Sequence, residues 1–245
     1  SRASELRGVI GDIADRAGGA PPTATNADDA AVIVAVGREA LRETVVSAPS
    51  GTVLPVGRSR LALDTDRANR VLRRFLGGSA PRSSAPQGPS HDAVDTDLAA
   101  TLESVDGVRR VSQPILAVDG ASASPRAALD VAFVTDSPAR ISEFAIEFAY
   151  GTSTTFRADG VVVATPLGSD GYANAAGAPV VEPGGGLAVA PIAPFRTQTS
   201  SWVAASELTV TVEREEEPVT LVIDGTNHGV VEPNRPIAIE TAGRV

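Results

Sequence analysis

The sequence predicts an α/β N-terminal domain followed by an all-β, sandwich-like C-terminal domain. Before residue 111, apolar runs of strand length alternate with segments of helical periodicity, which is typical of an open α/β domain. From Val111 onward, short β-rich runs follow one another with turn signals at fairly regular spacing, as in a β-sandwich. We therefore expect domains over residues 1–110 and 111–245 with a cleft between them, and leave open whether the C-terminal end packs back on the first domain.

The first half contains three predicted helices and two predicted strands. In order, these are a helix over residues 3–17, a strand ending at Val36, a helix over 39–47, a strand over 52–56 and a helix over 64–76. The strand ending at Val36 is continuously apolar, which predicts burial on both faces, as in a parallel sheet. Asp64 or Thr65 is the expected N-cap of the last helix, and Gly77-Gly78 ends it.

A linker and a series of short strands follow. Residues 77–91 are rich in small residues and proline and lack hydrophobic periodicity, which predicts a flexible linker. A helix is expected near Val94–Leu102. The predicted strands of the second half are residues 115–118, 129–134, 141–148, 161–164, 187–191, 208–212, 220–223 and 236–240. The charged run over 213–217, between two of these strands, is expected to be a solvated hairpin tip.

Composition excludes several classes of function. The chain has 245 residues, a net charge of −9 and no cysteine, and its two histidines, His91 and His228, form no ligand-spaced cluster, so no zinc site is expected. Arginine supplies every basic residue, which suggests either a halophilic chain or biased coding that removes lysine. The acidic balance argues against a nucleic-acid partner. No apolar run reaches membrane-spanning length and no secretory signal is recognisable, so we expect a cytoplasmic chain with no membrane partner.

One stretch, Ala158 to Pro183, stands out as a candidate site. Asp159-Gly160 precedes an apolar strand, and a turn rich in hydroxyls and glycine runs from Thr165 to Tyr172. Glycine permits close approach of backbone N–H groups to a ligand. The pattern taken alone is more typical of a tight turn between two core elements, because short Gly/Ser motifs often match by chance.

The same stretch resembles the nucleotide-binding signature of the NAD kinases. That signature is approximately Gly-Asp-Gly, four apolar residues, and Thr-Pro-Thr-Gly-Ser-Thr-Ala-Tyr. The matching residues here are Asp159-Gly160, Thr165-Pro166, Gly168-Ser169 and Tyr172, with Ala176–Pro179, Ala190–Pro194 and Ile223–Gly225 matching further downstream. Spacing and order hold from about Ala128 to the C-terminus. The chain is therefore identified as similar to the NAD kinase family.

The resemblance implies phosphoryl transfer from ATP to the 2′-hydroxyl of the adenosine ribose of NAD, with Mg²⁺ on the phosphates. It further implies a small-molecule dinucleotide partner and a homo-oligomer. The implied ligand-contacting residues are Gly37, Asp130, Asp159, Thr165, Ser169, Asp170, Tyr172 and Asp224. No protein metal ligand is expected. His228 is expected to be a polar turn residue.

Several positions depart from the family pattern. The family's general base is the aspartate of a Gly-Gly-Asp-Gly-Thr turn, and Gly37-Arg38-Glu39-Ala40-Leu41 stands in its place. Glu39 is the candidate base, one methylene longer than aspartate, and Ala40 adopts a positive φ less readily than glycine. Asp130-Val131 replaces an Asn-Glu pair that grips the adenosine, and Asp170 adds a negative charge beside an anionic ligand.

Three hypotheses stay open. The departures favour a NAD kinase-like protein that binds NAD(P) or an adenine nucleotide, with kinase activity weakened or lost. The second hypothesis is an active NAD kinase in which Glu39 serves as the base. The third is a structural or oligomerisation paralogue that binds no nucleotide.

Overall fold

The structure is a computed structural model that describes residue 4 and residues 32–47, 52–57, 60–77, 108–121, 124–137, 141–195, 200–215 and 217–245. The helix predicted over 3–17 (apart from Ser4), the linker predicted over 77–91 (apart from Gly77) and the helix predicted near 94–102 lie outside these ranges. The chain divides into two compact units. The first unit comprises Ser1–Thr44 and Pro49–Val111, and the second comprises Val45–Ala48 and Ser112–Val245.

The first unit contains a strand–helix–strand–helix sequence, apart from the last two residues of its first helix, which the division assigns to the second unit. The elements are β1 (Val32–Val36), α2 (Arg38–Val46), β2 (Thr52–Val56) and α3 (Thr65–Gly77). Strands β1 and β2 pair in parallel, and α2 is the crossover between them. These elements confirm the predicted α/β pattern and, within a residue or two, its boundaries.

Two local expectations in this unit have different outcomes. Asp64 is the N-cap of α3, because its Oδ1 accepts a hydrogen bond of 2.8 Å from the backbone N–H of Arg67. In β1, by contrast, only Ala35 is buried, and the other four side chains are half-buried. The continuous apolar run therefore correctly predicted a parallel strand, but the predicted burial of both faces was wrong.

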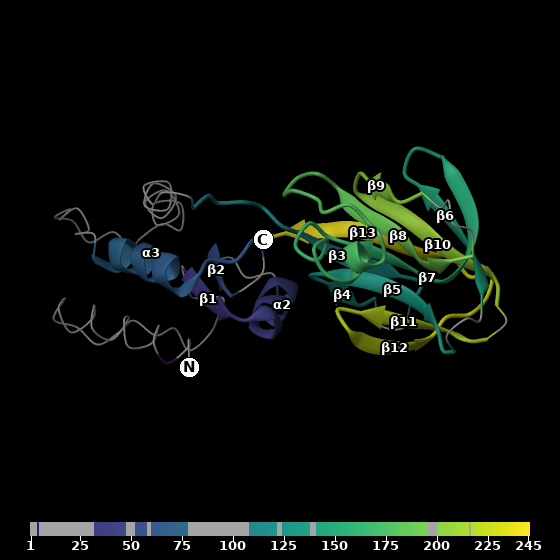
Figure 1. Ribbon diagram of the computed structural model, residues 1–245, viewed down its shortest axis with the longest axis horizontal. Coiled ribbons are helices and arrows are strands. Elements are labelled where there is room, and N and C mark those ends of the chain that lie inside the picture. Colours follow the sequence, from purple (N-terminus) through teal and green to yellow (C-terminus); the bar gives the residue numbers. More distant parts are fainter. Residues whose placement is uncertain are drawn as a thin grey trace. The chain divides into compact units, whose positions relative to one another are not determined.

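In its described residues, the second unit is a curled antiparallel sheet of eleven strands with one short helix (Figure 1). Its elements are β3 (Pro114–Asp119), β4 (Arg126–Ala127), β5 (Asp130–Thr135), β6 (Ser142–Phe148), β7 (Ser153–Ala164), α5 (Tyr172–Ala175), β8 (Leu187–Pro194), β9 (Trp202–Ala204), β10 (Glu207–Arg214), β11 (Val219–Ile223), β12 (Thr226–Val230) and β13 (Ile237–Arg244). The hydrogen-bonded order is β12-β11-β5-β7-β6-β10-β13-β3-β4, and β8 pairs with both β7 and β9. This arrangement confirms the predicted β-sandwich-like domain.

Strand β7 connects the parts of the curled sheet. Its first half pairs with β6, and its second half lies between β5 and β8. Side chains on one face of the second half, such as Val161 and Val163, enter the main hydrophobic core. Side chains on the other face, Val162 and Ala164, pack in a second cluster with Ala173, Ala178 and Val181. The chain that follows β7 is therefore held against one face of the sheet by small apolar residues.

All eight strands predicted in this half are present, but three further strands and one connection were not predicted. Strands β4, β9 and β12 are short or exposed, and β7 begins at Ser153 rather than Val161, so Asp159-Gly160 lies within a strand. The run over 213–217 is not a hairpin tip, because β10 pairs with β6 and β13, whereas β11 pairs with β5 and β12. The strands before and after the charged run therefore belong to separate parts of the sheet.

Within the described ranges, no helix combines the length and the apolar composition that a membrane span requires.

Candidate functional site

The turn that follows β7 is anchored by Thr165. Its side chain is fully buried, and its Oγ1 donates to the carbonyl of Ala128 at 2.7 Å. The backbone N–H of Thr165 donates to the carbonyl of Leu129 at 2.9 Å. On the other side, Oγ1 accepts from the N–H of Gly168 at 3.2 Å. The threonine hydroxyl therefore joins the start of the turn to the segment before β5.

Gly168 lies where that segment comes closest. A Cβ atom at this position would lie 2.1 Å from the carbonyl oxygen of Leu129, a distance that real Cβ atoms do not show. Its φ is not in the left-handed region, so the requirement for glycine comes from space rather than from backbone conformation. The missing side chain at Gly168 therefore makes room for another part of the backbone, and the approach of the turn to a ligand stays a prediction.

Ser169 closes the turn. Its buried Oγ donates to the carbonyl of Pro166 at 2.9 Å and accepts from the N–H of Val181 at 2.9 Å. This clasp ties the turn to the chain that leaves α5. The hydroxyls of Thr165 and Ser169 thus hold the frame of the turn.

Tyr172, Asp130 and Asp159 come together from three separate segments. Tyr172 begins α5 and is 43% exposed, Asp130 is buried at the start of β5, and Asp159 is half-buried in β7. Burial raises the pKa of the Tyr172 hydroxyl, and the carboxylates of Asp130 and Asp159 raise this pKa further because they disfavour a neighbouring phenolate. The hydroxyl of Tyr172 therefore lies within electrostatic reach of two carboxylates, one buried and one half-buried.

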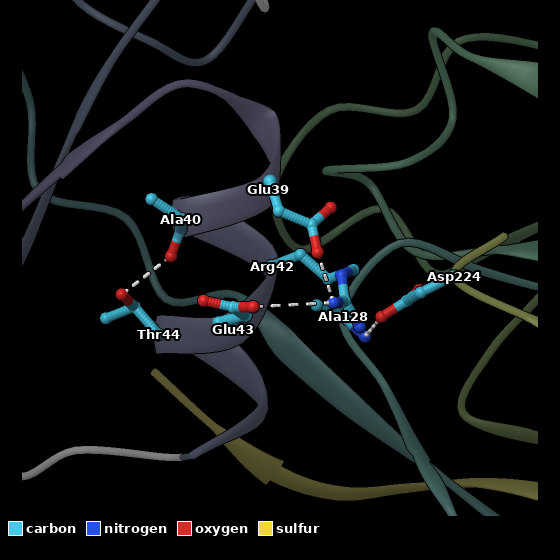
Figure 2. Close-up of polar contacts among 7 residues, drawn as sticks. All are labelled: Glu39, Ala40, Arg42, Glu43, Thr44, Ala128 and Asp224. Atoms are coloured by element: carbon cyan, nitrogen blue, oxygen red, sulfur yellow. Dashed lines mark hydrogen bonds and ion pairs between the residues drawn. The ribbon is translucent and has the colours of Figure 1, made fainter. Parts of the chain in front are cut away.

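Asp170 and Asp224 differ in how their side chains lie. Asp170 is exposed on the same turn as Ser169. Asp224 occupies the tight turn between β11 and β12, and its carboxylate accepts hydrogen bonds from the backbone N–H groups of Ala128, Leu129 and Asp130 (Figure 2 shows the first). His228 lies in the exposed edge strand β12, so its expected place in a turn is wrong.

The segment that resembles the family's Gly-Gly-Asp-Gly-Thr turn lies in the first unit. Gly37 has a φ of 91° and donates its N–H to the carbonyl of Val56 at 2.8 Å. Arg38, Glu39 and Ala40 form the first turn of α2. Ala40 is therefore helical, and the expected conflict between alanine and a positive φ does not arise.

The Glu39 side chain is 74% exposed and forms an ion pair with Arg42 at 2.5 Å, one turn further along α2 (Figure 2). The same guanidinium lies 3.8 Å from Glu43. In the same helix, Thr44 donates its hydroxyl to the carbonyl of Ala40 at 2.7 Å. The candidate base is thus a solvent-accessible carboxylate with a cationic neighbour.

Several partners in this site leave no signal in the amino-acid sequence. The carbonyls of Ala128 and Leu129 and the N–H of Val181 are backbone groups, which almost any residue type would supply. Only a pairing of distant segments could have revealed them. Within the described ranges, no group of three or more histidine, cysteine or acidic side chains is placed to hold a metal ion.

Comparison with known proteins connects this unit to one family. Residues 129–244 match the family model of the ATP-NAD kinase C-terminal domain. The chain is 40% identical over 94 residues to the NAD kinase of Methanospirillum hungatei, a match that covers 38% of this chain and 35% of the relative. It is 32% identical over 130 residues to the NAD kinase of Thermococcus kodakarensis, which covers 52% and 47%. The chain thus spans less than half the length of these relatives.

Two solved structures share the fold. An Archaeoglobus fulgidus NAD kinase in complex with ATP superimposes with a TM-score of 0.58 and 22% identity, covering 95% of this chain and 84% of that one. Yeast NADH kinase complexed with NADH gives a TM-score of 0.62 and 16% identity, covering 87% and 59%. At these identities the likeness concerns the fold, and it extends over both units of the chain.

Proposed function

We propose that this chain is a NAD kinase-like protein that binds NAD(P) or an adenine nucleotide, because residues 129–244 match the family model of the ATP-NAD kinase C-terminal domain. We propose further that its kinase activity is weakened or lost. The reaction in question is the transfer of a phosphoryl group from ATP to the 2′-hydroxyl of the adenosine ribose of NAD.

The observation that carries the binding proposal is the cluster of Tyr172, Asp130 and Asp159. Carboxylates accept hydrogen bonds from ribose hydroxyls and from an adenine amino group, and a partly exposed aromatic ring offers a face to a base. The Tyr172 hydroxyl, whose pKa lies above the ordinary 10.0, is neutral at physiological pH and can donate a hydrogen bond to a ligand. A buried turn, fixed by Thr165 and Ser169, holds the tyrosine in place.

The weakening follows from the chemistry of the altered positions. Glu39 carries its carboxylate one methylene further from the backbone than aspartate, and displacement of a reacting group by about 1 Å can cost about a hundredfold in rate. Its carboxylate also forms an ion pair with Arg42, so a substrate hydroxyl would compete with the guanidinium for it. Asp130 lacks the amide donor of asparagine, and exposed Asp170 adds a negative charge to a site that would receive phosphates.

ATP and Mg²⁺ are the proposed co-substrate and cofactor. A magnesium ion on a nucleotide is commonly held by one or two carboxylates together with the phosphates, so a separate protein cage is not required. When bound, the ion would neutralise charge on the phosphates of ATP. Gly37, whose positive φ begins the turn before α2, offers the backbone flexibility that close approach to a phosphate requires.

The test measures binding and turnover separately on the full chain. We expect calorimetry at high salt to detect weak NAD binding that decreases in Asp159→Asn and Tyr172→Phe. We expect NADP formation from NAD with ATP or polyphosphate to be far below that of an ordinary NAD kinase.

Glu39→Ala and Glu43→Ala are a matched pair for the base, because both glutamates are exposed and both lie beside Arg42. Robust turnover that Glu39→Ala abolishes and Glu43→Ala retains would show instead an active kinase with Glu39 as its base. If the chain bound none of NAD, NADP and ATP, the result would favour the third hypothesis, a structural or oligomerisation role. The homo-oligomer, the halophilic character and the cytoplasmic location stay predictions.

A further inference from the structure

We propose that Asp224 is a positioning residue, whose carboxylate holds residues 128–130 and, through them, the turn that carries Tyr172. This inference rests on the proposed function only for the nature of the ligand, because the positioning concerns the protein alone. It changes the role of Asp224 from a ligand contact to a support of the residues that contact the ligand.

The hydrogen bonds of Asp224 carry the inference. Oδ2 accepts from the N–H of Ala128 at 2.8 Å, and Oδ1 accepts from Leu129 at 2.7 Å and from Asp130 at 3.0 Å. The N–H of Asp224 in turn donates to the carbonyl of Asp130 at 2.9 Å. Both carboxylate oxygens are therefore occupied by backbone donors of one three-residue segment.

The conformation of the β11–β12 turn explains only in part why position 224 is an aspartate. Asp224 and Gly225 have φ values of 49° and 81°, and they form a two-residue connection between β11 and β12. Asp-Gly and Asn-Gly are both favoured in such hairpin turns. Asparagine would satisfy the backbone conformation, but its side chain has only one acceptor oxygen, and its NH₂ group would face a backbone N–H. The three hydrogen bonds therefore require the carboxylate.

Residues 128–130 in turn contact the turn that carries Tyr172. Thr165 bonds to the carbonyls of Ala128 and Leu129, and Gly168 packs directly on the carbonyl of Leu129. The third residue of the segment, Asp130, carries one of the two carboxylates that act on Tyr172. A displacement of this segment would therefore move both the turn and the carboxylate relative to the Tyr172 hydroxyl.

The experiment uses tyrosine as a reporter that needs no ligand. The chain has two tyrosines, so Tyr150→Phe leaves Tyr172 as the single one, whose ionisation is followed by tyrosinate absorbance in the full chain. In this background we expect Asp224→Asn to lower the pKa of Tyr172 toward its ordinary value, because the ring loses burial and its distance from Asp130 grows. We expect NAD affinity to fall by about tenfold in the same variant, as a misplaced contact predicts.

Asp119→Asn is the matched control. It removes the same charge, but the bond it weakens is local, from the N–H of Gly120 to Oδ1 of Asp119. We expect this variant to leave the pKa of Tyr172 unchanged. A folded Asp224→Asn chain in which the pKa of Tyr172 equals that of the parent would overturn the proposal.

If Asp224→Asn does not fold, Thr165→Val and Thr165→Ser test the next contact, between residue 128 and the turn, with the same tyrosine titration. Valine removes the hydroxyl that bonds to Ala128, and serine retains it. Only valine is expected to lower the pKa of Tyr172, and an equal pKa in both variants would overturn the proposal. A native chain that binds no nucleotide would contradict the proposed function, but the tyrosine titration would still test the positioning.

Discussion

Gly168 shows how the absence of a side chain supports the frame of the candidate site. The missing side chain leaves room for the carbonyl oxygen of Leu129, which would lie 2.1 Å from a Cβ atom. That oxygen belongs to backbone and cannot rotate away as a flexible side chain could. The absence of a side chain at Gly168 therefore lets the turn after β7 pack directly against Leu129, the residue that precedes β5.

We predict that Gly168→Ala lowers the free energy of unfolding by about 2–3 kcal/mol, the cost of overpacking a dense region. Gly243→Ala is the matched control, since Gly243 has no positive φ and a Cβ atom there would meet nothing within 4 Å. Its change should stay within about 0.5 kcal/mol. Urea unfolding of both variants measures the difference, and equal stabilities would contradict the steric argument.

Tyr172 makes the stability of the second unit depend on alkaline pH. Its hydroxyl has a pKa above the ordinary 10.0 in the folded chain, first because of burial and then because of Asp130 and Asp159. The folded chain therefore holds this proton more tightly than the unfolded chain. The resulting stability is fully present below pH 10.0 and is lost as the pH rises through the raised pKa.

We predict that Tyr172→Phe removes this component of alkaline destabilisation. Urea unfolding from about pH 9 to about pH 11 should show a smaller loss of stability in this variant than in the parent. Tyr150→Phe is the control, because Tyr150 is 87% exposed, and it should follow the parent. The same loss in Tyr172→Phe and the parent would contradict the prediction.

At the scale of single elements, helix α3 begins at a side-chain cap. Asp64 Oδ1 accepts from the N–H of Arg67, which otherwise has no partner within the helix. We predict that Asp64→Ala destabilises the first turn of α3 by about 1 kcal/mol, whereas Asp64→Asn retains the acceptor and most of the stability. Amide exchange over residues 66–72 should be about fivefold faster in the alanine variant. Equal exchange in the two variants would show that the cap contributes nothing.

Strands differ in how well the amino-acid sequence predicts them. The predicted strands bury apolar residues at strand spacing, and this pattern exists in the sequence before folding. Strand β12, over residues 226–230, is exposed at every position and is held by backbone pairing with β11, so no apolar pattern indicates it. The assignment of residues 213–217 to a hairpin was wrong for a related reason. Adjacent strands in sequence are more often neighbours, but here both strands have other partners.

At the scale of the whole molecule, the fold class of each half could be predicted because the hydrophobic periods of the two halves differ. The site was less predictable. Thr165, Ser169 and Tyr172 could be recognised by family resemblance, but a motif does not show which hydroxyls support the turn and which group faces outward. That distinction depends on backbone groups of residues 128, 129 and 181, which lie 12 to 37 positions away in sequence.

The structure also shows how the family pattern could be restored. By the family resemblance, Val131 stands where the NAD kinases have an adenosine-gripping glutamate, but it is fully buried in the main core and pairs in register with Val163 and Ile223. A glutamate there would bury an unpaired carboxylate, which costs several kcal/mol or forces protonation. Asp130 is the better position, because Asp130→Asn restores an amide donor beside Tyr172 without adding bulk.

We therefore predict that the triple change Arg38→Gly, Glu39→Asp and Ala40→Gly raises NADP formation only modestly by itself. Combined with Asp130→Asn, it should raise kcat/KM by about tenfold or more over either change alone, because base and substrate position act together. Combined with Val131→Glu, it should instead lower the urea midpoint. Steady-state NADP formation and urea unfolding of the same preparations measure both effects. Purely additive gains in kcat/KM would show that the two segments act independently, and a stable, more active Val131→Glu variant would show that position 131 tolerates the carboxylate.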